Sequence, residues 1–222
     1  ASYEHIEPEL VGNRTRLTVS EMSGRASLLH KAAELGLDLD RDSPETRHIL
    51  NRVKELESQG YEFEGADASL ELLLRKAKGE YRTFFTLLGY HVTATQHPSA
   101  PNTVSEATIK LALPDGTLMH TVSEGDGPVD ALNNALRKAV EPRYPELRDV
   151  RLDDYKVRIL NAQAATRAKT RVLIESSDRA SSWRTVGVSE NIISASYEAL
   201  VDSIEYKLLQ TRGHKDDGPA RE

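Results

Sequence analysis

The turn Gly125-Asp126-Gly127-Pro128 contains the residue types in this sequence that best suit binding chemistry. Glycine permits a tight turn and proline suits the first position of a helix, so we expect a strand to pass into a helix here. The first N–H groups of a helix have no partner within it and carry the positive end of its dipole, which suits a carboxylate. The turn lacks the GxGxxG spacing and the Lys-Ser or Lys-Thr of phosphate loops. It therefore indicates either a carboxylate site or an ordinary structural turn.

A second helix start of the same kind is expected at Glu190-Asn191-Ile192. Two such starts close to apolar strand residues would suit an amphipathic zwitterion with a branched side chain. The ligand class favoured by these residues alone is thus a small branched amino acid.

Residues able to perform catalysis are present, but not in catalytic patterns. No two of the seven histidines have the i, i+2 or i, i+4 spacing of metal sites. The acids Asp38 and Asp40, and the pair Asp153-Asp154, could serve acid–base chemistry, but acids in loops are more often solvated. Cysteine is absent, which excludes disulfides, thiolate zinc sites and cysteine nucleophiles. We expect no catalytic residue, no metal site and no cofactor in this chain.

The elements that would position the turn fall into two parts, of which the first is helical. A short strand at Arg16–Val19 and three helices are expected: Arg25–Leu35, the stretch between Ser43 and Gly60, and Ala68–Lys78. Ser43 can cap the second helix, Pro44 suits its first turn, and Gly60 can end it. Asp67 is the expected cap of the third. Residues 1–84 are therefore predicted to form a small helical linker subdomain that needs neighbours for stability.

The second part, residues 85–212, predicts the order strand, strand, strand, helix twice over. The expected strands are Tyr90–Gln96, Thr108–Leu113, Thr117–Ser123, Tyr155–Leu160, Thr170–Glu175 and Trp183–Val188. A shift of about 64 residues superposes Val122 on Val186 and Val129 on Ile193. We therefore predict an α+β fold in which the linker subdomain precedes two pseudo-symmetric β-β-β-α units, residues 88–141 and 153–210. The polar tail, residues 213–222, is expected to be disordered.

The composition limits the classes of partner. The chain has 222 residues, 38% hydrophobic and 29% charged, and its net charge of -6 argues against nucleic acid. No apolar run approaches the length of a membrane span, and the polar start does not read as a signal peptide, so we expect a cytoplasmic protein. One three-stranded sheet with one helix cannot bury both its faces. Two units can bury more, and a second copy of the chain can cover the rest.

Several stretches resemble the isopropylmalate and citramalate synthase family. Tyr3–Asn13 and Ser20–Ala26 resemble the segment that follows the catalytic barrel in that family. Gly125–Leu132 and Trp183–Ile193 resemble its LeuA-type regulatory, dimer-forming domain. Val53–Ser69 resembles the citramalate synthase branch. These resemblances cover nearly the whole chain.

The resemblance implies that the chain regulates an enzyme rather than being one. The parent would be an acyltransferase that condenses pyruvate with acetyl-CoA to citramalate, in isoleucine biosynthesis. The family's catalytic barrel, which holds its divalent metal, is not in this sequence, so we expect the chain to be inactive alone. The expected partners are a second copy of the chain, the barrel, and isoleucine as feedback inhibitor. The alternatives are a 2-isopropylmalate synthase regulatory domain that binds leucine, and a purely structural dimerisation module.

The resemblance also implies which residues contact the effector, between the two units and near the dimer interface. They are Gly125, Asp126, Gly127, Val129, Leu160, Ala168 and Val188. We expect Val129, Leu160 and Val188 to line a pocket for the isoleucine side chain, although each alone also suits ordinary core. Arg25–Lys78 would carry the signal to the barrel, with hinges expected at Gly36, Gly60, Gly65 and Gly79.

Overall fold

The computed structural model of the chain describes residues 24–37, 39–40, 43–95, 104–160 and 168–213. The helices described are α1 (Gly24–Glu34), α2 (Pro44–Gln59), α3 (Asp67–Ala77), α4 (Pro128–Val140), the short 3-10 helix η2 (Pro145–Asp149) and α5 (Ile192–Arg212). The strands are β1 (Thr86–Thr95), β2 (Val104–Ala112), β3 (Leu118–Gly125), β4 (Arg151–Leu160), β5 (Lys169–Ser177) and β6 (Ser182–Ser189). The predicted strand Arg16–Val19 and the polar tail beyond Gly213 lie outside the described residues.

The helical linker subdomain forms much as the capping residues predict. The Ser43 side chain accepts a hydrogen bond from the Thr46 N–H at 3.0 Å, and Gly60 ends α2 with a left-handed φ of 111°. The prediction that Asp67 caps α3 is wrong: Asp67 is the first helical residue, and no side chain caps this helix. Its carboxylate instead pairs with Lys31 of α1 at 3.1 Å, which ties two linker helices together.

The predicted α+β class and the two β-β-β-α units are confirmed. β1-β2-β3 form one antiparallel sheet, sheet A, and β4-β5-β6 form a second, sheet B. β1 and β4 begin four residues before their predicted starts, because each contains a register shift, between Leu87 and Gly89 and between Leu152 and Asp154. A β-bulge breaks the period-2 alternation, so the earlier residues do not read as strand.

Side-chain bonds repeat between the units as well. Thr121 Oγ1 donates to the Ala135 carbonyl at 2.7 Å, and Thr185 Oγ1 donates to the Ala199 carbonyl at 2.7 Å. Each bond joins the third strand of a unit to its helix, and the two bonds are 64 residues apart in sequence. The sequence shift therefore reflects a shared three-dimensional arrangement.

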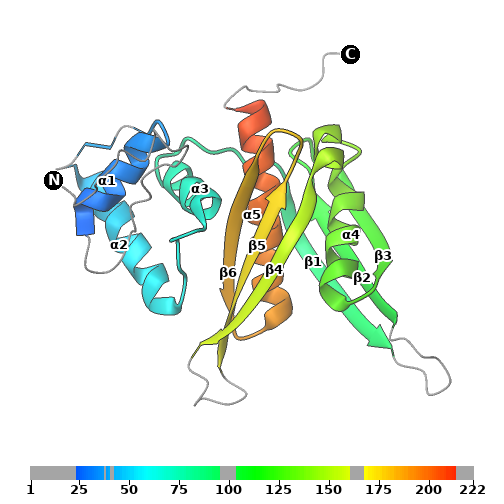
Figure 1. Cartoon of the computed structure of the whole chain (residues 1–222). Coiled ribbons are helices and arrows are strands. Elements are labelled where there is room, and N and C mark those ends of the chain that lie inside the picture. Colours follow the sequence, from blue (N-terminus) through cyan, green and yellow to red (C-terminus); the bar gives the residue numbers. More distant parts are fainter. Residues whose placement is uncertain (1–23, 38, 41–42, 96–103, 161–167, 214–222) are drawn as a thin grey trace, which may run out of the picture.

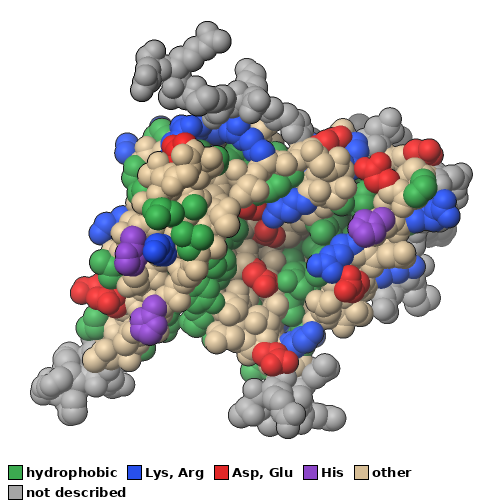
Figure 2. Space-filling model, turned by 180° about the vertical axis from the view of Figure 1, so that it is seen from behind, with side chains coloured by type: hydrophobic (Ala, Val, Ile, Leu, Met, Phe, Trp, Pro, Cys, Tyr) green, Lys and Arg blue, Asp and Glu red, His purple; other side chains and the backbone are tan. Residues whose placement is uncertain are grey.

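Two hydrophobic clusters hold the molecule together. The linker helices lie on the side of β6, as Figure 1 shows. The main core lies between the inner faces of the two sheets and the helices α4 and α5, which contact each other. The linker cluster joins α1, α2 and α3 to the outer face of β6 through Val186 and Val188. Among the described residues, no such cover lies on the outer face of sheet A, where Leu88, Leu118 and Val122 are exposed. Figure 2 shows the molecule from this side, with hydrophobic side chains among charged and histidine side chains. The two equivalent sheets thus differ in what covers them.

Candidate functional site

The glycine turn places the start of α4 directly against β3. A Cβ built on Gly125 would lie 2.3 Å from the Ala131 nitrogen, so this close approach requires glycine. Asp130 Oδ2 accepts a hydrogen bond from the Asp126 N–H at 3.0 Å and holds the turn closed. Gly127 differs, because a Cβ built there has no heavy atom within 4 Å and its φ of −156° is ordinary extended backbone. Nothing in the described fold therefore requires glycine at position 127.

The two helix starts that the sequence puts forward differ in their caps. The Asn191 side chain accepts hydrogen bonds from the Ile193 and Ser194 N–H groups at 2.8 and 3.3 Å, so α5 caps itself. Gly127 occupies the cap position of α4 and offers no side chain, and Pro128 has no N–H. The N–H groups of Val129 and Asp130 thus start α4 without a side-chain cap. Of the two starts, α4 is the one prepared for an external carboxylate.

The remaining predicted contact residues lie elsewhere in the chain. Val129 is half-buried and packs against the main core. Val188 and Leu160 belong to the linker cluster, where a Cβ built on Gly60 would meet Leu160 Cδ1 at 2.3 Å and Val188 Cγ1 at 3.5 Å. Ala168 is buried directly before β5. Within a single chain, the residues Gly125–Val129 therefore lie together, and Leu160 lies beside Val188. These two groups of predicted contact residues do not form one site.

Glu198 of α5 links the linker to β6. Its Oε2 accepts hydrogen bonds from the Tyr61 hydroxyl at 2.8 Å and from the Val188 N–H at 3.1 Å. Burial and the neighbouring Glu198 carboxylate raise the pKa of Tyr61 well above its usual range, so its hydroxyl stays protonated and donates. The helix that follows Asn191 is in this way bonded directly to the linker.

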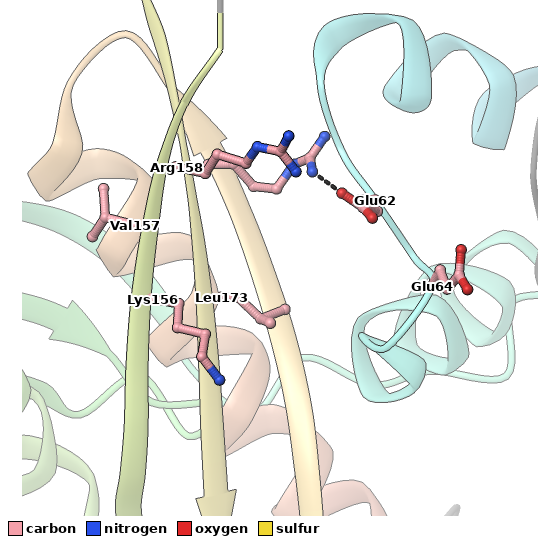
Figure 3. A pocket seen from close by; sticks show the side chains of 7 residues that line it. Glu62, Glu64, Lys156, Val157, Arg158 and Leu173 are labelled. Atoms are coloured by element: carbon pink, nitrogen blue, oxygen red, sulfur yellow. Dashed lines mark hydrogen bonds and ion pairs between the residues drawn. The ribbon is translucent and has the colours of Figure 1, made fainter.

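A charged groove, which the sequence analysis missed, lies between the linker and the outer face of sheet B (Figure 3). It has a volume of about 420 Å³ and is lined by Glu62, Glu64, Lys156, Arg158, Arg171 and Leu173, and by the edge of β4 at Val157, whose side chain points away from Glu62 and Glu64 in Figure 3. Arg171 donates to the Gly60 carbonyl at 2.6 Å and pairs with Glu62, and burial lowers its pKa. Part of the groove therefore serves to hold the linker against sheet B. Its residues are about 100 positions apart in sequence, so no local motif marks it.

The described residues contain no group of three or more His, Asp or Glu side chains placed to hold a metal ion. Within the same residues, no helix is long and apolar enough to cross a membrane.

Comparisons with known proteins match both parts of the chain. Residues 64–208 match the LeuA allosteric (dimerisation) domain, and residues 1–61 match the homocitrate synthase post-HMGL domain-like family. The chain is 53% identical to an (R)-citramalate synthase of Geobacter sulfurreducens over 207 residues, and 50% identical to one of Aquifex aeolicus over 209 residues. These alignments cover 93% and 94% of this chain and 39% of each relative. A 2-isopropylmalate synthase of Aquifex aeolicus is 30% identical over 215 residues, which cover 94% of this chain and 37% of that protein. The chain thus spans about two fifths of the length of these relatives.

Proposed function

Because the chain belongs to the LeuA allosteric (dimerisation) domain family and matches the C-terminal part of (R)-citramalate synthases, we propose that it is an effector-binding and dimerisation region whose effector is isoleucine. The whole protein would condense pyruvate with acetyl-CoA to citramalate, and isoleucine would be its feedback inhibitor. The main support for the proposal is the start of α4. No side chain caps its first N–H groups, and the fold does not require the glycine at the cap position, Gly127.

In this proposal the effector's carboxylate binds the N–H groups of Val129 and Asp130. A charge-assisted hydrogen bond at the positive end of a helix is stronger than a neutral one. The absent side chain at Gly127 leaves room for the carboxylate, and Val129 offers an apolar contact to the branched side chain. The Asp126 carboxylate, exposed in the same turn, suits the ammonium group.

Leu160, Ala168 and Val188 are proposed to transmit the effect of binding. Leu160 and Val188 touch Gly60, at the end of α2, and the Val188 N–H shares Glu198 with Tyr61. A shift at this end of sheet B would therefore move the linker. Inhibition requires only that isoleucine bind one arrangement of linker and domain better than the other.

The proposed ligand site lies close to an apolar surface that a second copy would cover. On the inner face of β4, Val157 is 43% and Ile159 63% exposed, and Ile192 is exposed at the start of α5. The end of β4 and the starts of α4 and α5 lie at the same end of the molecule in Figure 1. Exposed apolar patches of this kind mark association surfaces. We place the dimer contact here, which fits an effector bound near it.

Replacing Ile159 by aspartate is expected to weaken dimerisation by about tenfold or more, because it buries a charge in an apolar contact. Sedimentation velocity over a concentration series measures the change. The matched control is Leu118→Asp, since Leu118 is 61% exposed on the outer face of sheet A. Dissociation of the Leu118→Asp chain but not the Ile159→Asp chain would instead place the interface on sheet A.

The proposed carboxylate contact predicts that Gly127→Ser weakens isoleucine binding by about tenfold. Serine at a cap position accepts a hydrogen bond from the first N–H groups of its helix and would occupy the donors that the carboxylate needs. Because a side chain at 127 meets no neighbour, the thermal stability of the ligand-free chain should be unchanged or higher. Titration calorimetry with isoleucine measures the affinity.

Gly89→Ser is the control for this substitution, because a Cβ at Gly89 also has no heavy atom within 4 Å and lies outside the turn. Equal affinity of the wild-type and Gly127→Ser chains would remove the α4 start from the proposal. A thermal-shift panel of amino acids tests the function itself. Stabilisation by leucine alone favours a 2-isopropylmalate synthase regulator, and stabilisation by no amino acid favours a purely structural dimerisation module.

A further inference from the structure

Ser105 carries a buried hydroxyl for which the fold has no evident use. The side chain is fully buried, at 0% exposure, and its Oγ has no hydrogen-bond partner among the described residues. A buried hydroxyl without a partner has lost its bonds to water and gained none in exchange, so such groups are rare in folded proteins. Each such group calls for an explanation, and a partner that is absent from the structure is one of them.

The strand register places this hydroxyl beneath the start of α4. Ser105 lies directly opposite Gly125 in the β2–β3 pairing, and both residues face inward. The first turn of α4 rests on Gly125, because a Cβ there would touch the Ala131 nitrogen. The unpartnered hydroxyl and the uncapped N–H groups of Val129 and Asp130 therefore border the same corner of the first unit.

We propose that the Ser105 hydroxyl is a further contact of the amino-acid effector and accepts a hydrogen bond from its ammonium group. This inference rests on the proposed function. The helix N–H groups are donors only and take the carboxylate, so the ammonium needs acceptors. Ser105 Oγ has two free lone pairs, and the carboxylates of Asp126 and Asp130 in the adjoining turn favour a cation there. A ligand that carries both charges satisfies both halves of the site.

The second unit supplies a matched comparison. Thr170 lies opposite Ser189 in the β5–β6 pairing, at the place that Ser105 occupies opposite Gly125 in the first unit. There, however, Asn191 caps the helix start, so no carboxylate site adjoins the hydroxyl. The second unit therefore has a hydroxyl at the equivalent position, but no uncapped helix start lies beside it.

The test is titration calorimetry of isoleucine with the full chain, its Ser105→Ala variant and its Thr170→Val variant. Ser105→Ala is expected to weaken isoleucine binding about tenfold, as for loss of one hydrogen bond to a charged group. Thr170→Val should bind like the wild type. The thermal stability of the ligand-free Ser105→Ala chain should be unchanged or higher, because the variant removes an unsatisfied buried hydroxyl. Together these results support the contact.

A des-amino analogue, 3-methylpentanoate, identifies the group that Ser105 meets. It keeps the carboxylate and the branched chain, so it should bind the wild-type and Ser105→Ala chains equally. An equal loss of affinity for both ligands would overturn the ammonium contact. Isoleucine affinity within twofold of wild type in Ser105→Ala overturns the role of Ser105 and leaves the proposed function standing. Absence of any heat or thermal shift with isoleucine or leucine in the wild-type chain overturns the proposed function, and this contact with it.

Discussion

Replacing Gly187 by alanine is expected to destabilise the folded chain by about 3 kcal/mol or more. Gly187 lies in β6, where α5 crosses closest to sheet B. A Cβ at this position would lie 2.1 Å from the Ala195 carbonyl oxygen and 2.9 Å from Glu198 Cβ. Backbone atoms cannot turn aside as a flexible side chain can, so α5 would have to move away from the sheet. The loss would spread through the main core, which α5 shares with both sheets.

Chemical denaturation of the Gly187→Ala chain measures this loss. Gly89→Ala is the matched control, because Gly89 also lies in a strand but a Cβ there has no heavy atom within 4 Å. That substitution should be neutral or stabilise the chain by up to about 1 kcal/mol, since alanine restricts the unfolded chain more than glycine does. A Gly187→Ala chain as stable as the Gly89→Ala chain would mean that α5 does not pack this closely in solution.

The sequence predicts the two units well because their signals are local. Ser43, Pro44 and Gly60 delimit α2 by capping chemistry, and the Gly125–Pro128 turn joins β3 to α4 as expected. The helix start at Asn191 also carried a local signal, since asparagine is a preferred cap residue. The residue at the cap position therefore distinguishes the two helix starts: asparagine caps α5 with its own side chain, and glycine leaves the start of α4 uncapped.

Features that depend on tertiary contact could not be read in the same way. Val186 and Val188 are buried on the outer face of β6, while Thr185 and Gly187 are buried on its inner face. With both faces covered, the apolar pattern does not say that the two valines face the linker and that Thr185 and Gly187 face the main core. Ser105 is a single serine in a strand, and only the register with Gly125 and the absence of a partner make it notable.

The contact between α3 and α5 shows how linker and regulatory domain are coupled. The Ser69 hydroxyl donates to Asp202 Oδ2 at 2.6 Å and accepts from the Val186 N–H at 3.0 Å. One linker side chain thus joins the edge of β6 to a carboxyl on α5. Lys76, also on α3, pairs with Glu205 at 2.8 Å and lies 4.0 Å from Asp202. The contact between α3 and α5 thus has two acidic side chains, Asp202 and Glu205, for the one basic side chain of Lys76. The stability of this contact should therefore depend on pH.

Replacing Asp202 by asparagine is expected to stabilise the chain at pH 8 and to have little effect near pH 4. Burial raises the pKa of the Asp202 carboxyl to about 7, and Glu205 and Glu198 add to the rise, while Lys76 and the Ser69 hydroxyl oppose it. Because the folded-state pKa lies above the ordinary value of 3.8, the folded state binds the proton more tightly than the unfolded state. The carboxyl therefore costs stability progressively as the pH rises from about 4 to about 7, and the cost is constant above that.

A pKa rise of this size corresponds to at most about 4 kcal/mol. Asp202 keeps 24% of its side chain exposed, so solvent reduces the expected gain to about 2 kcal/mol at pH 8. Asparagine is neutral at every pH and can still accept the Ser69 hydrogen bond. Denaturant titrations of both chains at pH 4.5, 6 and 8 should show the difference widening with pH. Ser69→Ala should act in the opposite sense, because it removes a bond to the charged carboxylate and leaves the Val186 N–H without its acceptor. Parallel pH profiles for the wild-type and Asp202→Asn chains would mean that the α3–α5 joint is open to water, and that this carboxyl does not make the linker contact depend on pH.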